Sequence, residues 1–326
     1  MFNADWVEAN PHKPVLYHQI IHALQPKRGG FYVDGTLGAG GHASGILDAS
    51  SPDGQLLGLD VDPQALVLAQ QRLAPYGARA IIRQSSYTDL QAQLDELGRH
   101  AVDGILLDLG ISSMQLDTPQ RGFSFMADAP LDMRFDPKKP QTAADLVNEL
   151  PQAELSRILF EYGEARMANK IARAIVQSRP LKTTTELAEL IIRVVGSAKR
   201  SAKKDSPRHA KRLHPATRTF QALRIAVNAE LEALETVLPI ALESLAPGGR
   251  LAVIAFHSLE DRIVKRFVRR ESRDCICPPR QPACNCGHHA CLLEITRRPL
   301  RPDPDEVQEN PRARSARLRV AEKLAR

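Results

Sequence analysis

The sequence lacks any apolar run near the roughly 18 residues that a membrane-spanning helix needs. Its first residues, Met1 to Asp5, contain neither the basic nor the apolar region of a secretory signal peptide. From these two absences we expect a cytoplasmic protein without a membrane partner.

The dinucleotide-binding fingerprint G-x-G-x-x-G is also missing. In its place, residues 31–42 read Phe-Tyr-Val-Asp-Gly-Thr-Leu-Gly-Ala-Gly-Gly-His. We interpret this stretch as the first strand of a parallel sheet and a ligand-binding loop, because glycine permits positive φ and lets a ligand approach backbone N–H groups. An acid before the glycines resembles the first motif of methyltransferases that use S-adenosylmethionine (AdoMet). A tight turn without a ligand is the alternative.

Cysteine is absent from the first 274 residues, and all five cysteines lie between positions 275 and 291. They form Cys275-x-Cys277 and Cys284-x-Cys286, followed by Cys291, with two histidines nearby. In a cytosolic protein this clustering disfavours disulfides and suggests zinc. Because the spacing is C-x-C rather than C-x-x-C, a structural zinc and reduced loop thiols both stay open. We assign no metal to the catalytic site.

Acidic and basic residues are unevenly distributed along the chain. Residues 1–116 carry 7 Lys/Arg and 12 Asp/Glu, whereas the remaining 210 residues carry 37 and 26, for a net charge of +6 overall. A basic surface supplied by the later part favours a polyanionic partner such as RNA. A solubilising face with no partner is the alternative.

Apolar strand-like segments alternate with helical ones as far as residue 108. This order predicts an α/β fold with a doubly wound, mostly parallel sheet, in which ligands bind at the carboxyl ends of the strands. Predicted strands begin at Phe31 and cover 55–60, 80–83 and 102–108; predicted helices cover 17–24, 41–49, 63–73 and 90–97.

Two acids follow the second predicted strand. Asp60 stands at the offset at which an acid binds ribose hydroxyls in nucleotide-binding folds. Asp62 precedes Pro63 and fits a helix N-cap followed by proline at the first helical position. We therefore assign the ribose to Asp60 and the cap to Asp62.

The regular alternation stops after residue 115. Residues 116–140 show no period and predict an ordered loop near the active site, whereas 142–196 are helical and 198–212 are strongly basic. We therefore expect a methyltransferase domain formed by 1–115 and 213–326, with an all-helical insertion at 116–212 for RNA recognition.

The last third returns to the sheet. An amphipathic helix after residue 214 is expected to break at Pro239. A strand over 250–256 leads to His257 and a helix over 259–270, and segments 292–296 and 316–320 are expected to pair as an antiparallel edge.

Eight ordered motifs together resemble the RsmH (MraW) family over nearly the whole chain. They are Asp34-Gly-Thr-x-Gly-x-Gly-Gly-His42, Asp60-x-Asp62-Pro, Asp108-Leu-Gly-Ile-Ser-Ser113, Arg121-Gly-Phe-Ser-Phe125, Leu131-Asp-Met-Arg134, His214-Pro-Ala-Thr-Arg-Thr-Phe-Gln221, Phe256-His-Ser-Leu-Glu-Asp-Arg262 and Asn310-Pro-Arg-Ala-Arg-Ser315.

The resemblance implies a class I, Rossmann-like fold and AdoMet-dependent methylation of the exocyclic N4 of a decoding-region cytidine in small-subunit (16S) ribosomal RNA. Implied cofactor contacts are Gly40, Gly41, His42, Asp60, Tyr87, Asp108 and Gln115. Candidate substrate contacts in the other motifs are Phe123, Arg134, His214, Arg218 and Ser258. The substrate, naked RNA or assembled small subunit, and the oligomeric state, monomer or homodimer, stay open.

The candidate catalytic residues are Asp108 and His257. Asp108 is predicted to lie between the cofactor and the amine, although it would equally suit a purely cofactor-holding role. For His257 a helix cap or core hydrogen bond is the alternative. At the level of the whole protein, an NAD-dependent dehydrogenase is disfavoured by the missing fingerprint, and a non-catalytic RNA-binding ribosome assembly factor is the remaining alternative.

Overall fold

The computed structural model describes residues 14–201, 214–278, 281 and 283–325, and divides the chain into two compact units. The sheet unit comprises the chain up to Gly110 together with Leu231–Arg326, and the helical unit is Ile111–Glu230.

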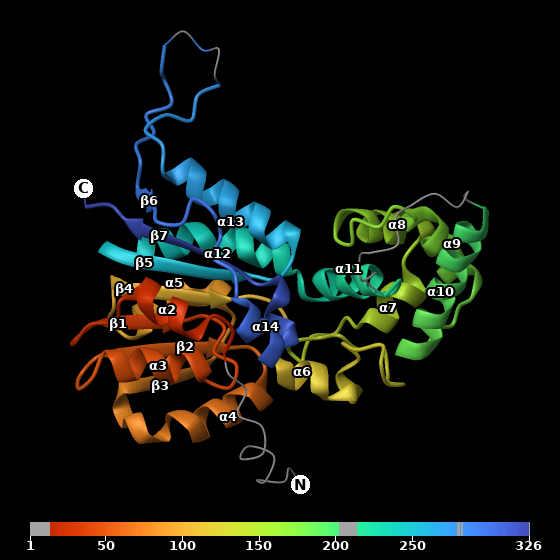
Figure 1. Ribbon diagram of the computed structural model, residues 1–326, viewed down its shortest axis with the longest axis horizontal. Helices are drawn as coiled ribbons and strands as arrows, with labels where there is room; N and C mark the ends of the chain where they lie inside the picture. The colour runs from red at the N-terminus through yellow and green to blue at the C-terminus, as the bar shows by residue number, and fades with distance from the viewer. Residues whose placement is uncertain (1–13, 202–213, 279–280, 282, 326) are drawn as a thin grey trace. The chain divides into compact units, whose positions relative to one another are not determined.

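The sheet unit contains a seven-stranded sheet in the order β3-β2-β1-β4-β5-β7-β6 (Figure 1). Strands β1 to β5 pair in parallel, and β7 pairs antiparallel with both β5 and β6. The strands are β1 Phe31–Asp34, β2 Gln55–Asp60, β3 Ala80–Gln84, β4 Val102–Asp108, β5 Leu245–Ala255, β6 Leu292–Glu294 and β7 Arg317–Lys323. The predicted doubly wound, mostly parallel sheet is confirmed.

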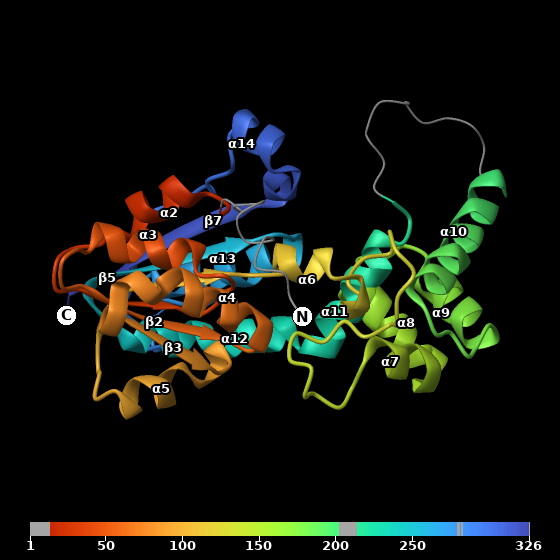
Figure 2. The ribbon, with the colours of Figure 1, turned by 90° about the horizontal axis from the view of Figure 1, so that it is seen from below.

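Helices cover both faces of this sheet (Figure 2). Alternate residues of each strand point to opposite faces, so Leu106 of β4 packs on the side of α2, α3 and α4, while Ile105 and Leu107 pack on the side of α5, α12 and α13. The helices of this unit are α2 Tyr17–Leu24, α3 Gly41–Ala49, α4 Pro63–Leu73, α5 Leu90–Glu96, α12 Glu230–Ser244, α13 Ser258–Glu271 and α14 Pro304–Glu309, with short 3-10 turns η1 Ala74–Arg79, η2 Tyr87–Asp89 and η4 Pro311–Ser315.

One expectation about the last third of the chain needs correction. The helix after residue 214 ends at Asn228, where Ala229 takes the left-handed conformation (φ 52°), and α12 then continues through Pro239. Pro239 therefore does not break the helix. The final segments pair antiparallel at the edge of the sheet, as predicted, and β7 also pairs antiparallel with β5.

The helical unit packs five main helices around its own apolar core. Its helices are α6 Ser113–Asp117, α7 Ala143–Glu149, α8 Gln152–Glu161, α9 Ala168–Gln177, α10 Thr184–Ser201 and α11 Thr217–Asn228, with the 3-10 turn η3 Pro119–Arg121. A capping box of Thr142 and Asp145 starts α7, with each side chain accepting the backbone N–H of the other residue.

The second boundary of this unit differs from the expected one at residue 212. Helix α11 packs against α7 and α8, and its apolar residues Phe220, Leu223 and Val227 belong to the helical core. The unit therefore extends to Glu230. A helix whose apolar stripe is shared with neighbours cannot be assigned to one domain from its own periodicity.

Candidate active site

The glycine-rich loop joins β1 to α3. Gly38 and Gly40 have φ of +52° and +78°, a conformation that side chains with a Cβ rarely adopt. A Cβ on Gly40 would also lie 3.2 Å from Leu73 of α4. The loop therefore requires glycine for its turn and for its close packing on α4.

The two acids after β2 lie as predicted. Asp62 accepts a hydrogen bond from the backbone N–H of Gln64 at 3.0 Å and caps α4, with Pro63 at its first turn. The carboxylate of Asp60 accepts hydrogen bonds from Gly38 N–H at 2.8 Å and Asp62 N–H at 2.9 Å. Burial nevertheless raises the pKa of Asp60 to about 6, more than these hydrogen bonds lower it. The cap is confirmed, and the ribose contact of Asp60 stays a prediction.

Asp34, the last residue of β1, is almost fully buried at 1% exposure. Burial raises the pKa of Asp34 to about 7, although His42 and the backbone N–H of Thr36 oppose this shift. Thr36 also accepts a hydrogen bond from the backbone N–H of Asp108 at 2.6 Å. Thr36 therefore connects the ends of β1 and β4.

His42 and Asp108 come together at this edge. Nε2 of His42 lies 3.5 Å from Oδ2 of Asp108, and the imidazole stacks on Tyr17 with 6.3 Å between ring centroids. Among the described residues, neither ring nitrogen of His42 nor Oδ1 of Asp108 has a hydrogen-bond partner. Buried polar atoms are rarely left unpaired in proteins, so these atoms are suited to contacting a ligand.

Of the remaining predicted cofactor contacts, Gly41 is the first residue of α3, and Tyr87 and Gln115 lie in different units. Tyr87 begins η2 after β3. A Cβ added to Gly35 would lie 3.1 Å from the Cβ of Tyr87, so Tyr87 borders the glycine-rich loop. Gln115 belongs to the helical unit, where it forms a capping box with Ser112 at the start of α6. Its amide oxygen accepts the backbone N–H of Ser112 at 3.1 Å.

The strand ends fit the chemistry of AdoMet. Carboxylates end β1, β2 and β4, at Asp34, Asp60 and Asp108, and the loop that Gly40 shapes lies among them. AdoMet offers ribose hydroxyl donors and cationic sulfonium and ammonium groups, which carboxylates bind well. The unpaired oxygen of Asp108 is an acceptor available for such a group.

His257 is the N-cap of α13. Its Nδ1 accepts the backbone N–H of Glu260, and the carboxylate of Glu260 accepts the N–H groups of Phe256 and His257. This reciprocal arrangement is a capping box. The helix-cap alternative for His257 is therefore confirmed, and its catalytic role stays a prediction.

A basic pocket of about 260 Å³ lies at the N-terminus of α13, where β5 ends. Arg317 in this pocket lies 3.2 Å from Asp261, while Arg301 and Arg314 are exposed. Three guanidinium groups beside a helix N-terminus are suited to binding an anion such as phosphate. The pocket, which includes the predicted substrate residue Ser258, is lined by Phe256, His257, Ser258, Arg301, Arg314, Ser315, Ala316 and Arg317.

Two predicted substrate contacts, Phe123 and Arg134, interact with other side chains of the helical unit. Phe123 is only 6% exposed and stacks on Phe135 at 5.6 Å, so its ring belongs to the core of the helical unit. This position favours a role in packing the loop against its own unit, and the substrate contact of Phe123 stays a prediction. Arg134 forms two hydrogen bonds to the carboxylate of Asp132, at 2.9 and 2.7 Å.

The two remaining candidates are more accessible. His214 is exposed and stacks on Phe125 with 4.4 Å between ring centroids. Arg218 is also exposed, and its guanidinium donates to the carbonyl of Glu164 at 2.7 Å. Both stay predicted substrate contacts.

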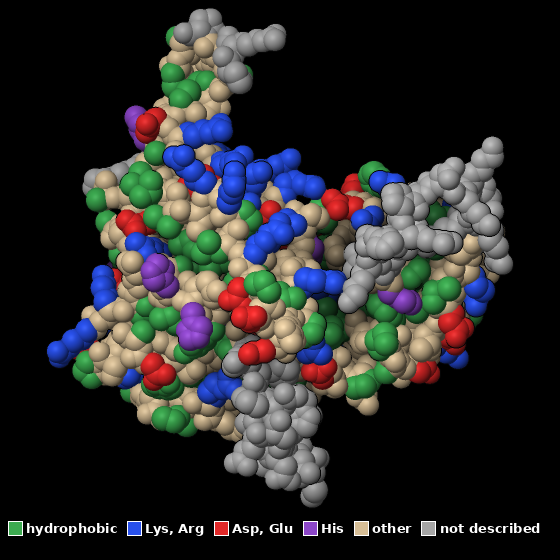
Figure 3. Space-filling view, viewed as in Figure 1, with side chains coloured by type: hydrophobic (Ala, Val, Ile, Leu, Met, Phe, Trp, Pro, Cys, Tyr) green, Lys and Arg blue, Asp and Glu red, His purple; other side chains and the backbone are tan. Residues whose placement is uncertain are grey.

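Basic side chains gather over α13 in the sheet unit (Figure 3). At intervals of three and four, Arg262, Lys265, Arg266 and Arg269 lie along this helix. The predicted basic run covers 198–212, and its residues 202–212 lie outside the described residues. Among the helices that the structure describes, none is long and apolar enough to cross a membrane.

Comparison with known proteins identifies the family. A model described as the MraW methylase family matches residues 9–324. The chain belongs to this family. Proteins named Ribosomal RNA small subunit methyltransferase H are similar over 96% of this chain: those of Carboxydothermus hydrogenoformans and Geobacter sulfurreducens are 52% identical, over 98% and 99% of their own lengths. That of Heliobacterium modesticaldum is 50% identical over 98% of its length.

As a member of the MraW methylase family, the chain is a methyltransferase whose cofactor is AdoMet. Two residues of the candidate site, Asp34 and Arg301, are missing from the site residues predicted from the sequence. Asp34 was visible as the acid before the glycines, but its burial was not. No local motif marks Arg301 as a site residue. It lies 13 residues before Arg314 in the sequence, and the two meet in one pocket only because the C-terminal segment folds back.

Proposed function

We propose that this chain transfers a methyl group from AdoMet to the exocyclic N4 of a decoding-region cytidine in small-subunit ribosomal RNA. The observation that carries the proposal is the arginine pocket next to the predicted cofactor site. Support also comes from relatives about 50% identical over 96% of the chain, whose name states small-subunit ribosomal RNA methylation.

The pocket and the candidate catalytic carboxylate share one edge of the sheet unit. Asp108 pairs with Ile254 in the register of β4 and β5, and Leu109 donates its N–H to the carbonyl of Ile254. A Cβ on Gly110 would lie 3.5 Å from the ring of Phe256, which lines the pocket. An RNA phosphate bound by the arginines would therefore place the attached nucleotide close to Asp108.

The chemistry depends mainly on positioning. Bound AdoMet supplies an electrophilic methyl group on its sulfonium centre. The lone pair of a cytosine amine is delocalised into the ring, so the amine must be oriented within about 3–3.5 Å of the atom that it attacks. Oδ1 of Asp108 is a buried acceptor without a partner among the described residues, and it suits an N–H of that amine.

Different residues of the sheet unit bind the amine, the cofactor and the RNA backbone. Asp108 orients and polarises the amine, and it would accept the proton that the nitrogen loses as the methyl group passes to it from the sulfur of AdoMet. Asp60 and the loop around Gly40 hold the cofactor. The arginines bind phosphates flanking a base that is single-stranded or flipped out of its helix, as enzymes that modify bases require.

The test is transfer of labelled methyl from AdoMet to purified small ribosomal subunits that lack the modification, followed by nucleoside digestion. We expect label in N4-methylcytidine. Label in another nucleoside would contradict the proposed target but keep the methyltransferase. Absence of label on both subunits and naked ribosomal RNA, from protein that binds AdoMet, would favour a non-catalytic assembly factor.

A further inference from the structure

The segment between α13 and β6 leaves the sheet unit as an excursion without regular secondary structure (Figure 1). At its base, Cys291 donates its backbone N–H to the carbonyl of Glu271 at 2.7 Å, and Ala290 donates to the carboxylate of Asp274 at 3.2 Å. Of the described residues in 272–291, none is buried. The excursion therefore has no apolar core of its own, and small units of this kind usually need a disulfide or a metal to hold them.

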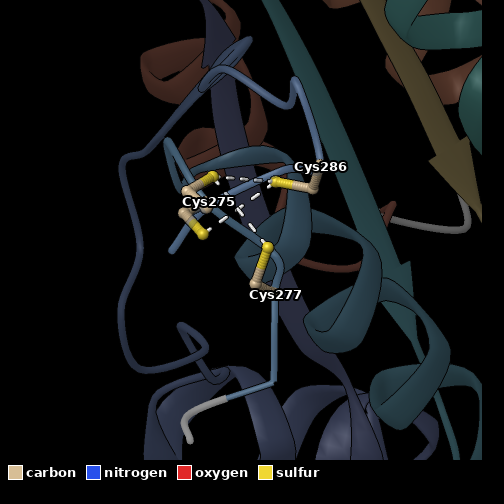
Figure 4. A group of neighbouring side chains, drawn as sticks. Cys275, Cys277 and Cys286 are labelled. Atoms are coloured by element: carbon tan, nitrogen blue, oxygen red, sulfur yellow. Dashed lines mark hydrogen bonds between the residues drawn. The ribbon is translucent and has the colours of Figure 1, made fainter. Parts of the chain in front are cut away.

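Four cysteines of this excursion converge on one point (Figure 4). The Sγ atoms of Cys275, Cys277, Cys284 and Cys286 all lie within 4.8 Å of one another. Three of the separations are 3.9 Å for Cys277 to Cys284, 3.5 Å for Cys284 to Cys286 and 3.9 Å for Cys286 to Cys275.

These separations match a tetrahedral metal site. Four sulfurs about 2.3 Å from a central Zn²⁺ lie about 3.8 Å from one another. A disulfide requires about 2.05 Å between sulfurs, so no pair here is bonded. The C-x-C spacing, which left the sequence ambiguous, therefore still brings all four thiols to tetrahedral distances.

The neighbouring candidates do not belong to the ligand set. Nδ1 of His288 lies 2.9 Å from the carbonyl of Arg273, and its Nε2 lies 3.2 Å from the carboxylate of Glu271. Both ring nitrogens therefore contact the base of the excursion. Sγ of Cys291 contacts the carbonyl of His289. What remains is an all-sulfur set, and thiolates select zinc over hard cations such as Mg²⁺ or Ca²⁺.

The backbone also favours a thiolate at one ligand. The backbone N–H groups of Ile276 and His288 donate hydrogen bonds to Sγ of Cys286. Such N–H donors stabilise the negative sulfur that a metal binds.

We propose that Cys275, Cys277, Cys284 and Cys286 bind one Zn²⁺ ion that holds the excursion folded. Four protein ligands complete a tetrahedral shell and leave no position for water or substrate, so the site is structural rather than catalytic. Binding displaces the thiol protons, and no redox change is involved. The proposal does not depend on which RNA nucleotide the chain modifies.

The test uses the full chain purified under reducing conditions, as wild type and as three variants. Metal analysis should find about one zinc per chain in the wild type and in Cys291→Ser, which removes a thiol outside the cluster. Cys277→Ser and Cys286→Ser should lose zinc at least tenfold more readily to a chelator. Cobalt substitution of the wild type should give the visible absorption of tetrahedral thiolate coordination, and Cys277→Ser should lack it.

A structural role also predicts protease sensitivity. Chelation should expose the excursion to cleavage in the wild type while AdoMet binding stays unchanged, which separates loss of the metal from loss of the whole fold. Iron in place of zinc, equal zinc loss from Cys291→Ser and Cys286→Ser, or a chain that binds no zinc with all five thiols reduced would overturn the proposal.

Discussion

Nε2 of His42, in the first turn of α3, lies 3.5 Å from Oδ2 of Asp108, the last residue of β4. This contact connects the glycine-rich loop to the strand whose end carries the candidate catalytic carboxylate. Thr36 provides a second connection, because its hydroxyl accepts the N–H of Asp108 while its own N–H donates to Asp34. The ends of β1 and β4 therefore form one hydrogen-bonded group.

Asp108→Asn tests the role of the carboxylate. Asparagine keeps the size of the side chain but removes its charge and half of its acceptor capacity. We expect methyl transfer to fall by about 10²-fold or more, because an electrostatic contact made in the transition state is lost. The measurement is single-turnover methyl transfer, with AdoMet affinity determined in parallel.

The matched control for this variant is Asp95→Asn, on the exposed face of α5, which should retain full activity. If Asp108→Asn lost AdoMet affinity and rate to the same degree, the carboxylate would hold the cofactor and have no separate effect on the amine.

Asp34→Asn tests the buried acid. The folded-state pKa of Asp34 is about 7, above its ordinary 3.8, so the folded chain holds a proton that the unfolded chain has lost between these values. Stability should therefore fall as pH rises from about 4 to 7. An asparagine side chain cannot ionise, so the variant avoids the loss of stability that comes from ionising a buried carboxyl group. This loss is at most about 4 kcal/mol, because one pKa unit is about 1.4 kcal/mol.

The measurement is urea unfolding of both proteins without ligand between pH 4 and 8. The Asp34→Asn variant should be the more stable protein at pH 8, and the difference should disappear near pH 4. Asp60, with a pKa of about 6, contributes to both profiles, and its charge also raises the pKa of Asp34. A difference that does not change with pH would contradict a buried, titrating Asp34.

Charge reversal at Arg301 and Arg314 tests the pocket. Replacing both by glutamate should weaken binding of ribosomal RNA at least tenfold and reduce the dependence of log Kd on log salt by about one for each lost phosphate contact. AdoMet affinity should not change. Filter binding of RNA over a range of salt concentrations measures the RNA affinity and its salt dependence.

Arg28→Glu is the control for total charge. Arg28 is exposed and paired with Asp53 before β1 and β2 begin, at the end of the sheet opposite the pocket. Arg28→Glu changes the net charge by −2 and the pocket variant changes it by −4, so a loss in log Kd half as large for Arg28→Glu would mean that only the net charge of the chain matters.

Gly122→Ala tests how the loop after η3 is held. Gly122 has φ +70°, and a Cβ there would overlap the carbonyl oxygen of Pro130 and lie 2.8 Å from the backbone nitrogen of Asp132. Gly98 has a similar φ of +62° but no atom within 4 Å of an added Cβ. Gly98→Ala should therefore cost only about 1–2 kcal/mol of backbone strain, and Gly122→Ala clearly more.

Thermal unfolding of the two glycine variants measures this difference. Equal destabilisation would show that the contact with Pro130 relaxes without cost and that only the left-handed backbone matters.

Local signals were sufficient for most elements of the sheet unit. Asp62 with Pro63 marks the start of α4, and the apolar run of β4 ends at Asp108 as predicted. These features depend on neighbours in sequence. The left-handed break at Ala229, the core position of Phe123 and the insertion of β7 beside β5 depend on packing between distant segments, which periodicity does not report.

The candidate site divides in the same way. Residues at strand ends could be predicted because parallel strands end at one edge of a sheet. The assembly of the arginine pocket, with Arg301 in it, could not, because Arg301, Arg314 and Arg317 meet His257 only when the C-terminal segment folds back on β5.

The most direct test of the proposed reaction is mass spectrometry of small-subunit ribosomal RNA from cells whose own gene for this protein has been deleted. These cells are given a plasmid copy that encodes either the wild type or Asp108→Asn. The wild type should add one methyl group to a decoding-region cytidine, with fragmentation that places it on N4 of the base. The Asp108→Asn variant should leave that cytidine largely unmodified. A methyl group on the ribose or on ring carbon 5, or equal modification by the two proteins, would contradict the account.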